Sequence, residues 1–486
     1  EYWCLTMDTV KTNLYRDYLR FLATEFKVEY SSYAEYHNWS INYSSEFWET
    51  ISKYFKIEFD QPYSKVQKQK EHPWKTVWFL DSKLNYAKHI FRNYNTEHPA
   101  LIYQSETTPL NEISWQELLG QTLRLQEKLV NLGVEQGDVV AAYGPNTPAT
   151  VAAFLACNSL GAIWSSCSPD FGIEAVCDRF IQLTPKVLFS YSSYTHNGKE
   201  YNTSKKVEQL KKILGKACES VSLEEYDVFE NNTRSLKELS FTPVDFSAPI
   251  WILFSSGTTG KPKAIVHKTG AMLLEHLKAL GLHQNVCPGD RYFWYSTTGW
   301  MMWNYALSSL LCGASLCVYN GAANHPNQNV LWDFVTKAKI NHFGHGASYY
   351  QALFKNISFS VKTSELALKT LGSTGSPLDA ATTVKLQNTF SKTHIISLSG
   401  GTDVCTAFVG GHPELDVKPG EIQCKMLGAP VSIYDENAKK VIDSPGELVL
   451  EGPFIALPKA LWGDEDFSQY KKSYYSMFDN VWNHGD

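Results

Sequence analysis

From residue 99 onward, short apolar segments alternate with longer segments of helical spacing. The apolar segments have the length of buried strands and lie at 101–103, 139–143, 162–164 and 186–190. Helical segments separate them at 115–132, 148–160 and 174–183. Gly133 and Gly161 follow the first two, where a glycine commonly ends a helix. Repeated strand–helix–strand units of this kind predict a parallel sheet with helices on both faces.

The rest of the chain divides into parts around this pattern. Residues 1–95 are rich in aromatic residues, and Phe47, Trp48 and Ile51 lie at helical spacing, with Ser44 or Ser45 available as N-cap. Further apolar strands are predicted at 251–254, 315–319 and 395–398, and short β segments with Gly/Pro turns begin near residue 427. We therefore predict an α/β fold of stacked parallel sheets with flanking helices. Its parts are a helical region (1–95), a core (96–426) and a small, barrel-like β region (427–486).

Composition excludes several classes of protein. Hydrophobic residues make up 43% of the chain, so a large core forms and global disorder is excluded. A formal charge of −6 argues against nucleic-acid binding through a basic surface. The cysteines form no CxxC pair, and no secretory signal opens the chain, which favours reduced thiols and a cytoplasmic location. The uncharged run 301–319 is interrupted by Asn304 and Gly313, so we predict a helix, a glycine end and a buried strand rather than a membrane span.

The segment that follows the predicted strand 251–254 has the composition of an anion-binding loop. Its residues are Ser255, Ser256, Gly257, Thr258, Thr259, Gly260, Lys261, Pro262 and Lys263. The glycines allow a tight turn that exposes backbone N–H groups, while the hydroxyls and lysines add donors and positive charge, as a polyphosphate requires. The spacing is not that of a Walker A loop, because the second glycine comes too soon. The alternative is a plain surface turn.

Several motifs in this order resemble those of the adenylate-forming enzymes, a superfamily that includes the acyl-CoA synthetases. They are the loop 255–263, the turn 371–378, the segment 399–403, the strand 446–450 and the final His484-Gly485-Asp486. The resemblance implies that Gly375, Ser376 and Pro377 contact adenine and that Asp486 binds the ribose hydroxyls. In the segment 399–403, it implies that Gly401 borders the nucleotide, that Thr402 contacts the α-phosphate and that Asp403 serves Mg²⁺. Many relatives have Glu at the position of Asp403, so the shorter carboxylate makes either direct or water-mediated contact.

Two further segments, 294–304 and 467–486, resemble the branch of this family that activates acetoacetate. Acetate-using relatives have bulky aromatics where this sequence has Ser399, Gly400 and Gly401. We interpret Gly400 as leaving room for a longer acid and Trp300 as a wall of the same pocket. The alternative for the glycines is a plain tight turn.

The resemblance implies an acid–thiol ligase that uses ATP, Mg²⁺ and coenzyme A. A carboxylate oxygen attacks the α-phosphorus of ATP, which gives an acyl-adenylate and releases pyrophosphate. The CoA thiolate then attacks the acyl carbon and releases AMP. The first step needs charge neutralisation and positioning, for which Lys261 and Thr402 are the candidate catalytic residues. Arg179 is a candidate contact of the CoA phosphates, whereas a core role for His345 is at least as plausible as a place in the acyl passage.

Members of this family continue past the ribose-binding Asp into a mobile lid that carries a further lysine used in adenylation. Because the sequence stops at Asp486, we expect the large domain without its lid, which should bind its ligands better than it turns them over. Two other functions stay open: a synthetase for acetate, propionate or butyrate, and a non-catalytic nucleotide-binding module. An α/β-hydrolase is disfavoured because no Gly-x-Ser-x-Gly motif occurs. The oligomeric state is not predicted.

Overall fold

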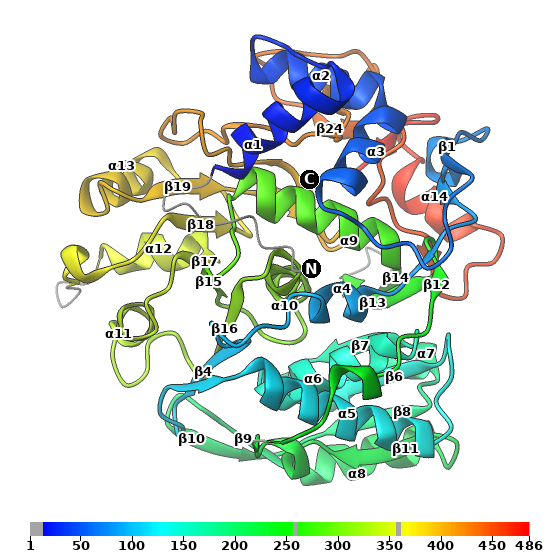
Figure 1. Ribbon diagram of the computed structural model, residues 1–486, viewed down its shortest axis with the longest axis vertical. Coiled ribbons are helices and arrows are strands. Elements are labelled where there is room, and N and C mark those ends of the chain that lie inside the picture. The colour runs from blue at the N-terminus through cyan, green and yellow to red at the C-terminus, as the bar shows by residue number, and fades with distance from the viewer. Residues whose placement is uncertain (1–12, 231, 256–259, 356–360, 486) are drawn as a thin grey trace.

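The computed structural model describes residues 13–230, 232–255, 260–355 and 361–485. Seven strands form the first sheet, which lies in the lower part of Figure 1. In spatial order they are β11 (Glu219–Ser222), β8 (Val187–Ser190), β6 (Val139–Tyr143), β7 (Ile163–Cys167), β13 (Pro249–Ser255), β14 (Lys263–Lys268) and β25 (Ala460–Leu461). The strands from β11 to β13 run parallel, and β14 and β25 are added antiparallel.

A second sheet, at the left of Figure 1, also has seven strands. Their order is β19 (His394–Ser397), β18 (Thr370–Thr374), β17 (His342–Gly346), β15 (Arg291–Trp294), β16 (Ser315–Asn320), β4 (Leu101–Ser105) and β5 (Asn111–Ile113). All neighbours are parallel except β4 and β5. The predicted α/β class with parallel sheets and flanking helices is therefore confirmed.

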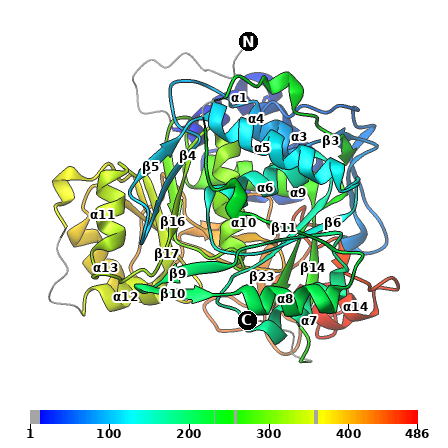
Figure 2. The same cartoon turned by 90° about the horizontal axis from the view of Figure 1, so that it is seen from below.

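Period-two alternation divides the strand residues between two faces of each sheet. In β13, Ile252 packs with α7 (Ile173–Leu183) and α8 (Ser204–Leu214), whereas Leu253 faces the core shared by both sheets. In β15, Phe293 packs with the outer helices α11 (Val330–Lys337), α12 (Ala347–Leu353) and α13 (Ala380–Thr389), and its neighbour Trp294 faces the shared core. The two sheets are thus stacked through one common core (Figure 2).

The shared core contains helices that come from distant parts of the sequence. They are α4 (Tyr86–Phe91), α5 (Trp115–Asn131), α6 (Pro148–Ser159), α9 (Thr269–Leu277) and α10 (Met301–Leu307). In α6 every residue is buried, and in α9 even the polar ones are. A helix that is buried on every side has either apolar side chains all round or polar side chains that pair with other buried groups. Helix α9 has polar side chains of this kind.

The structure has a strand at each of the strand segments predicted from residue 99 onward, but one pairing was not foreseen. The strand at 101–103 became β4 of the second sheet, beside β16, while the next strand, β6, lies in the first sheet. Residues 301–319 form α10, a 3₁₀ turn (Ser308–Cys312) and β16, with Gly313 at φ 76° ending the turn. Within the described parts of the chain, no helix is both long and apolar enough to cross a bilayer.

The N-terminal region packs on the shared core through aromatic side chains. It comprises α1 (Leu14–Phe21), α2 (Tyr33–Asn42), α3 (Ser44–Tyr54), β1 (Lys65–Lys68), β2 (Val77–Leu80) and β3 (Lys83–Leu84). Phe47, Trp48 and Ile51 are fully buried, as their spacing predicts. The predicted N-cap at Ser44 or Ser45 is wrong, because Tyr43 alone separates α2 from α3 and caps both, which places Ser44 inside the first turn.

The last part of the chain forms small antiparallel sheets and not a closed barrel. One sheet contains β20 (Ser399–Gly401), β21 (Thr406–Gly410) and β22 (Cys424–Lys425), and the other contains β23 (Val431–Tyr434), β24 (Glu447–Leu450) and β26 (Trp482–Asn483). Between β24 and β26, the chain returns to the first sheet as β25 and then forms α14 (Ser468–Tyr474). The remaining strands are β9 (Ser193–His196), β10 (Lys199–Asn202) and β12 (Val244–Asp245).

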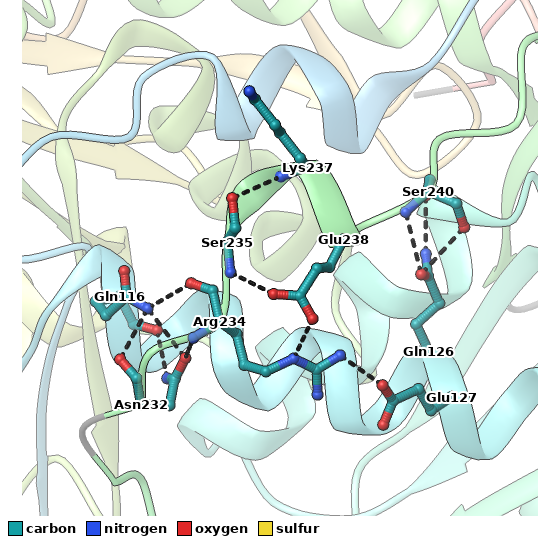
Figure 3. A network of polar contacts seen from close by, with 9 residues as sticks. All are labelled: Gln116, Gln126, Glu127, Asn232, Arg234, Ser235, Lys237, Glu238 and Ser240. Atoms are coloured by element: carbon teal, nitrogen blue, oxygen red, sulfur yellow. Dashed lines mark hydrogen bonds and ion pairs between the residues drawn. The ribbon is translucent and has the colours of Figure 1, made fainter.

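A polar network fastens the connection between β11 and β12 to the outer surface of α5 (Figure 3). The Arg234 guanidinium bridges Glu127 on α5 and Glu238, at 2.6 Å from each. Gln116 donates to the carbonyl of Arg234, and Gln126 donates to that of Ser240, so α5 holds this connection at both ends. The pairs are partly exposed, so they orient the segment more than they stabilise the fold.

Histidines enclosed by the fold make it sensitive to acid. Burial lowers the pKa to about 4 in His37 and His276, and to about 3 in His89, His267, His345 and His412. The unfolded chain binds these protons below about pH 6.5 and the folded chain does not, so stability is complete above that pH and is lost as the pH falls. Each histidine contributes up to about 1.4 kcal/mol per pH unit in this window. We expect the melting temperature to fall steadily from pH 7 to pH 5 at constant ionic strength; a constant or rising value would contradict this reading.

Candidate functional site

A pocket opens between the second sheet, α10 and the hairpin of β20 and β21. Its volume is about 100 Å³, whereas one water needs about 10–15 Å³ of such space. The lining residues come from α10 and its N-cap, from the end of β18 and from the segment 398–407. Trp300, Gly375, Gly400, Gly401 and Thr402, all singled out in the sequence, line this one pocket.

The predicted phosphate loop connects two antiparallel strands. β13 ends at Ser255 and β14 begins at Lys263, and these two residues face each other in register. Residues 256–259, which include Ser256, Gly257, Thr258 and Thr259, lie outside the described residues. Gly260 has φ +92°, a left-handed conformation that favours glycine, and the Lys261 side chain is exposed. The Ser255 hydroxyl is buried and has no hydrogen-bond partner in the described part of the chain. The loop therefore links two antiparallel strands.

Lys263 and Asp403 join the loop to the segment after β20. Lys263 Nζ lies 3.2 Å from Asp403 Oδ1 and 4.8 Å from the ring centroid of Tyr474 on α14. The Tyr474 hydroxyl donates to the same Oδ1. Burial and the neighbouring carboxylate raise the pKa of Tyr474 well above its usual value, so this tyrosine stays protonated and remains a donor. Both contacts use one oxygen of Asp403.

The predicted adenine turn follows the carboxyl end of β18. Gly375 has φ +84° and lines the pocket. A Cβ atom at this position would lie 3.9 Å from the Trp300 ring. Ser376 and Pro377 are exposed, and the Pro377 carbonyl accepts a hydrogen bond from Gln351. Asp486, predicted to bind ribose, lies outside the described residues.

The two glycines before Thr402 are required by close packing. A Cβ on Gly400 would lie 1.9 Å from the Thr406 carbonyl oxygen, and one on Gly401 would lie 2.5 Å from the His484 ring. Both residues line the pocket, but their missing side chains point at β21 and His484. Glycine at position 400 therefore allows β20 to approach β21. That Gly400 also leaves room for a longer acid stays a prediction.

Arg179 stands apart from this pocket, near the stem of the loop. Its guanidinium lies over the rings of Phe171 and Phe254, with its centre 5.1 and 5.7 Å from their centroids. Nη1 donates to the Ala175 carbonyl, and no carboxylate pairs with Arg179 in the described part of the chain. Phe254 directly precedes Ser255, so this cation stands at the base of the loop.

His345 lies at the end of β17 in an aromatic stack. Its ring is parallel to Tyr295 and Tyr349, at centroid distances of 4.7 and 4.0 Å. Nδ1 accepts from the Gly346 N–H, and burial lowers the pKa to about 3. The imidazole is therefore neutral near pH 7 and is held in the aromatic packing, which is one of the two roles left open by the sequence.

Known proteins share both the sequence and the fold of this chain. The AMP-binding enzyme family matches residues 89–458, and the acetyl-coenzyme A synthetase N-terminus matches residues 33–90. Acetoacetyl-CoA synthetases of Mus musculus and Rhizobium meliloti (strain 1021) are 36% and 35% identical, over 94% and 100% of this chain and 71% and 76% of those proteins. The solved acetoacetyl-CoA synthetase from Streptomyces lividans matches with a TM-score of 0.89 at 34% identity, over 98% of this chain and 76% of that one.

The chain belongs to the acetoacetyl-CoA synthetase branch of the AMP-binding enzymes. This membership explains why the motif residues of the sequence, from Trp300 to Thr402, gather at one pocket although they lie on separate elements.

Sequence reasoning missed several residues that hold the surroundings of this pocket together. Tyr474 holds Asp403, and two consecutive residues of α9, Glu275 and His276, contact the segment just after it. No local pattern marks these residues, because each is more than 70 positions from its partner in the sequence. Only the all-buried character of α9, with polar residues inside, distinguishes it.

The residues around Asp403 would hold Mg²⁺ only together with the phosphates of a bound nucleotide. No group of three His, Cys, Asp or Glu residues able to hold a metal occurs in the described ranges. Mg²⁺ in such sites is commonly held by one or two carboxylates, several waters and the substrate phosphates. Because Lys263 and Tyr474 both contact Oδ1, the Oδ2 atom of Asp403 is the oxygen left for a metal or its water.

Proposed function

We propose that this chain is the catalytic body of an ATP-dependent acid–CoA ligase, AMP-forming, whose acid substrate is acetoacetate. The single observation that carries the proposal is the convergence of Trp300, Gly375 and Thr402 on one pocket of a fold shared with acetoacetyl-CoA synthetases. The match extends over nearly the whole chain, so it includes both the pocket residues and the elements that support them.

In the first step, the residues of this chain bind and orient two anions that repel each other. Lys261 and Lys263 supply positive charge beside the phosphates, and the Thr402 hydroxyl contacts the α-phosphate. Trp300 forms a wall of the pocket that receives the acid. Such positioning and charge neutralisation are the main contributions a protein makes to phosphoryl-type transfer.

Asp403 and Arg179 are proposed to serve Mg²⁺ and CoA. When bound, Mg²⁺ would neutralise phosphate charge, and Asp403 would hold it directly or through a water. The guanidinium of Arg179 carries its charge without an acidic partner in the described ranges, which suits a phosphate of CoA. The thiolate attack on the acyl carbon needs no nucleophile from the protein.

The substrate is tested by the binding of non-hydrolysable acyl-adenylate mimics. We would titrate the 486-residue chain with acyl sulfamates of adenosine carrying acetoacetyl, acetyl, propionyl or butyryl groups, using calorimetry. The acetoacetyl mimic should bind at least about tenfold more tightly than the acetyl one, a difference of about 1.4 kcal/mol. Preference for butyryl would indicate another short-chain synthetase, and binding of ATP with no acyl preference would favour a nucleotide-binding module.

Removing the phosphate contacts should weaken nucleotide binding without unfolding the chain. In the double variant Lys261→Ala, Thr402→Val, one exposed lysine and one hydroxyl are lost. We expect ATP affinity to fall about ten- to hundredfold, since each charged hydrogen bond is worth about 1.5–3 kcal/mol. The matched control is Lys216→Ala, an exposed lysine outside the site. Unchanged ATP affinity in the double variant would reject the assignment of both residues.

A further inference from the structure

Two consecutive residues of α9, Glu275 and His276, are fully buried although both are polar. His276 Nε2 lies 2.7 Å from the carbonyl oxygen of Cys405. Glu275 Oε1 accepts a hydrogen bond of 2.8 Å from the Thr406 hydroxyl. One helix therefore contacts two successive residues of the segment that leads from Asp403 into β21.

The hydrogen-bond partners fix which nitrogen of His276 carries the proton. The Cys405 carbonyl only accepts, so Nε2 must donate, and Nδ1 must then accept from the Ser308 hydroxyl at 2.6 Å. Burial lowers the pKa of His276 to about 4, which keeps the ring neutral. Tyr86 on α4 contacts the same Ser308 hydroxyl, so the ring is held from behind.

Lys278 supplies the charge that allows Glu275 to be buried. Its Nζ lies 2.9 Å from Glu275 Oε1 and donates to the Leu427 carbonyl at 2.8 Å. Both side chains are completely buried. The carboxylate that holds Thr406 is thus itself held in place.

The segment held in this way contains a strained turn. Cys405 has φ 51°, an uncommon value for a residue with a side chain, and its N–H donates to the Gly401 carbonyl at 2.9 Å. Thr402 lies within this turn, and Thr406, which also lines the pocket, follows it directly. A conformation that costs free energy persists only where its surroundings determine it.

We propose that Glu275 and His276 are positioning residues of the acid and nucleotide pocket. By holding the Thr406 hydroxyl and the Cys405 carbonyl, α9 sets the conformation of the turn that presents Thr402. Neither residue lines the pocket, so both act through the turn. The inference rests on the proposed function, since the pocket residues it positions are those assigned above.

Asparagine and glutamine substitutions separate the two nitrogens of His276. Glutamine places an amide near Nε2 and keeps the bond to Cys405, whereas asparagine reaches only the position of Nδ1. With the acetoacetyl sulfamate of adenosine as probe, His276→Asn should bind about tenfold more weakly, because a buried acceptor left unpaired costs about 1–3 kcal/mol. His276→Gln should stay within about threefold of the parent chain.

His283 provides a matched control, because it lies in the helical segment Lys278–His283 that directly continues α9. It is equally buried, and its ring also contacts backbone groups, the Gly411 carbonyl at 3.0 Å and the Leu427 N–H at 3.2 Å. These contacts lie away from the turn of Thr402. His283→Asn should lower the melting temperature about as much as His276→Asn while leaving the affinity for the probe unchanged. Equal weakening by both variants, or by neither, would overturn the proposal.

A second pair of variants tests Glu275 without leaving a buried charge. In Glu275→Gln, Lys278→Met the acceptor for Thr406 remains, and in Glu275→Leu, Lys278→Met it is lost, although both pairs are neutral. Only the second should weaken binding of the probe; equal affinities would remove Glu275 from the proposal. If the parent chain itself does not bind the probe, the proposed function fails and not this inference alone.

Discussion

Replacing Lys278 with methionine should destabilise the folded chain by about 3–5 kcal/mol, because it leaves the Glu275 carboxylate buried without its partner. Both side chains are inaccessible to solvent, so water cannot take the place of the lost ammonium group. The neighbouring Thr406 hydroxyl contributes one hydrogen bond, which is too little to offset a buried charge. The measurement is the midpoint of the first unfolding transition in urea, together with the melting temperature.

The pH dependence of this loss identifies its cause. Burial raises the pKa of Glu275, and removal of Lys278 raises it further, so the variant folds more easily once the carboxyl is protonated. The difference between variant and parent should therefore be smaller at pH 5.5 than at pH 8. The double variant Glu275→Leu, Lys278→Met should recover most of the stability. A single variant as stable as the parent at pH 8 would show that the pair is not a stabilising contact.

Gly400→Ala should weaken the binding of an acyl-adenylate mimic. Its Cβ would stand 1.9 Å from the Thr406 carbonyl oxygen and 2.5 Å from Ala407 Cα, and both of these are backbone atoms. Relief requires β20 and β21 to separate, and Thr406 and Ala407 line the pocket. We expect a loss of about ten- to hundredfold in affinity and about 1–3 kcal/mol in stability, the usual cost of overpacking. Calorimetric titration and thermal unfolding of the same sample measure both.

The control for this variant is Gly172→Ala. No atom lies within 4 Å of its Cβ position, and its φ of −61° suits any residue. This substitution should leave affinity and melting temperature close to those of the parent chain. If Gly400→Ala behaves like Gly172→Ala, the close approach of β20 to β21 is not needed for the pocket.

The strands and helices of this fold could be predicted because they depend on local pattern. The segments predicted at 139–143 and 148–160 match β6 and α6 to within one residue. Strand length, helical spacing and a terminal glycine can all be recognised from residues that are neighbours in the sequence. Strand partners are different, because β4 pairs with β16, more than 200 residues away. Nothing in the local pattern of β4 distinguishes this partner from β6.

The candidate site shows the same division. Thr402, Gly375 and Trp300 were identified because they lie in contiguous motifs, and the structure brings them to one pocket. Tyr474 and His276 could not be found in this way, because they contact the site from elements that are distant in the sequence. The close approach of β20 to β21, which requires glycine at position 400, could not be predicted either, because the two strands meet only in the folded chain.

The chain returns to the first sheet as β25, and this return limits how far the chain can be shortened without exposing the sheet. Lys459 N–H donates to Val266, and Trp462 N–H donates to Ala264, so β25 covers the outer edge of β14. A shortened chain that ends before residue 459 would expose unpaired backbone groups along β14, the strand that carries Lys263. Exposed strand edges of this kind recruit other chains and promote aggregation. The segment that contains β25 therefore cannot be removed from the core: it shields β14, which begins at Lys263 in the predicted phosphate-binding loop.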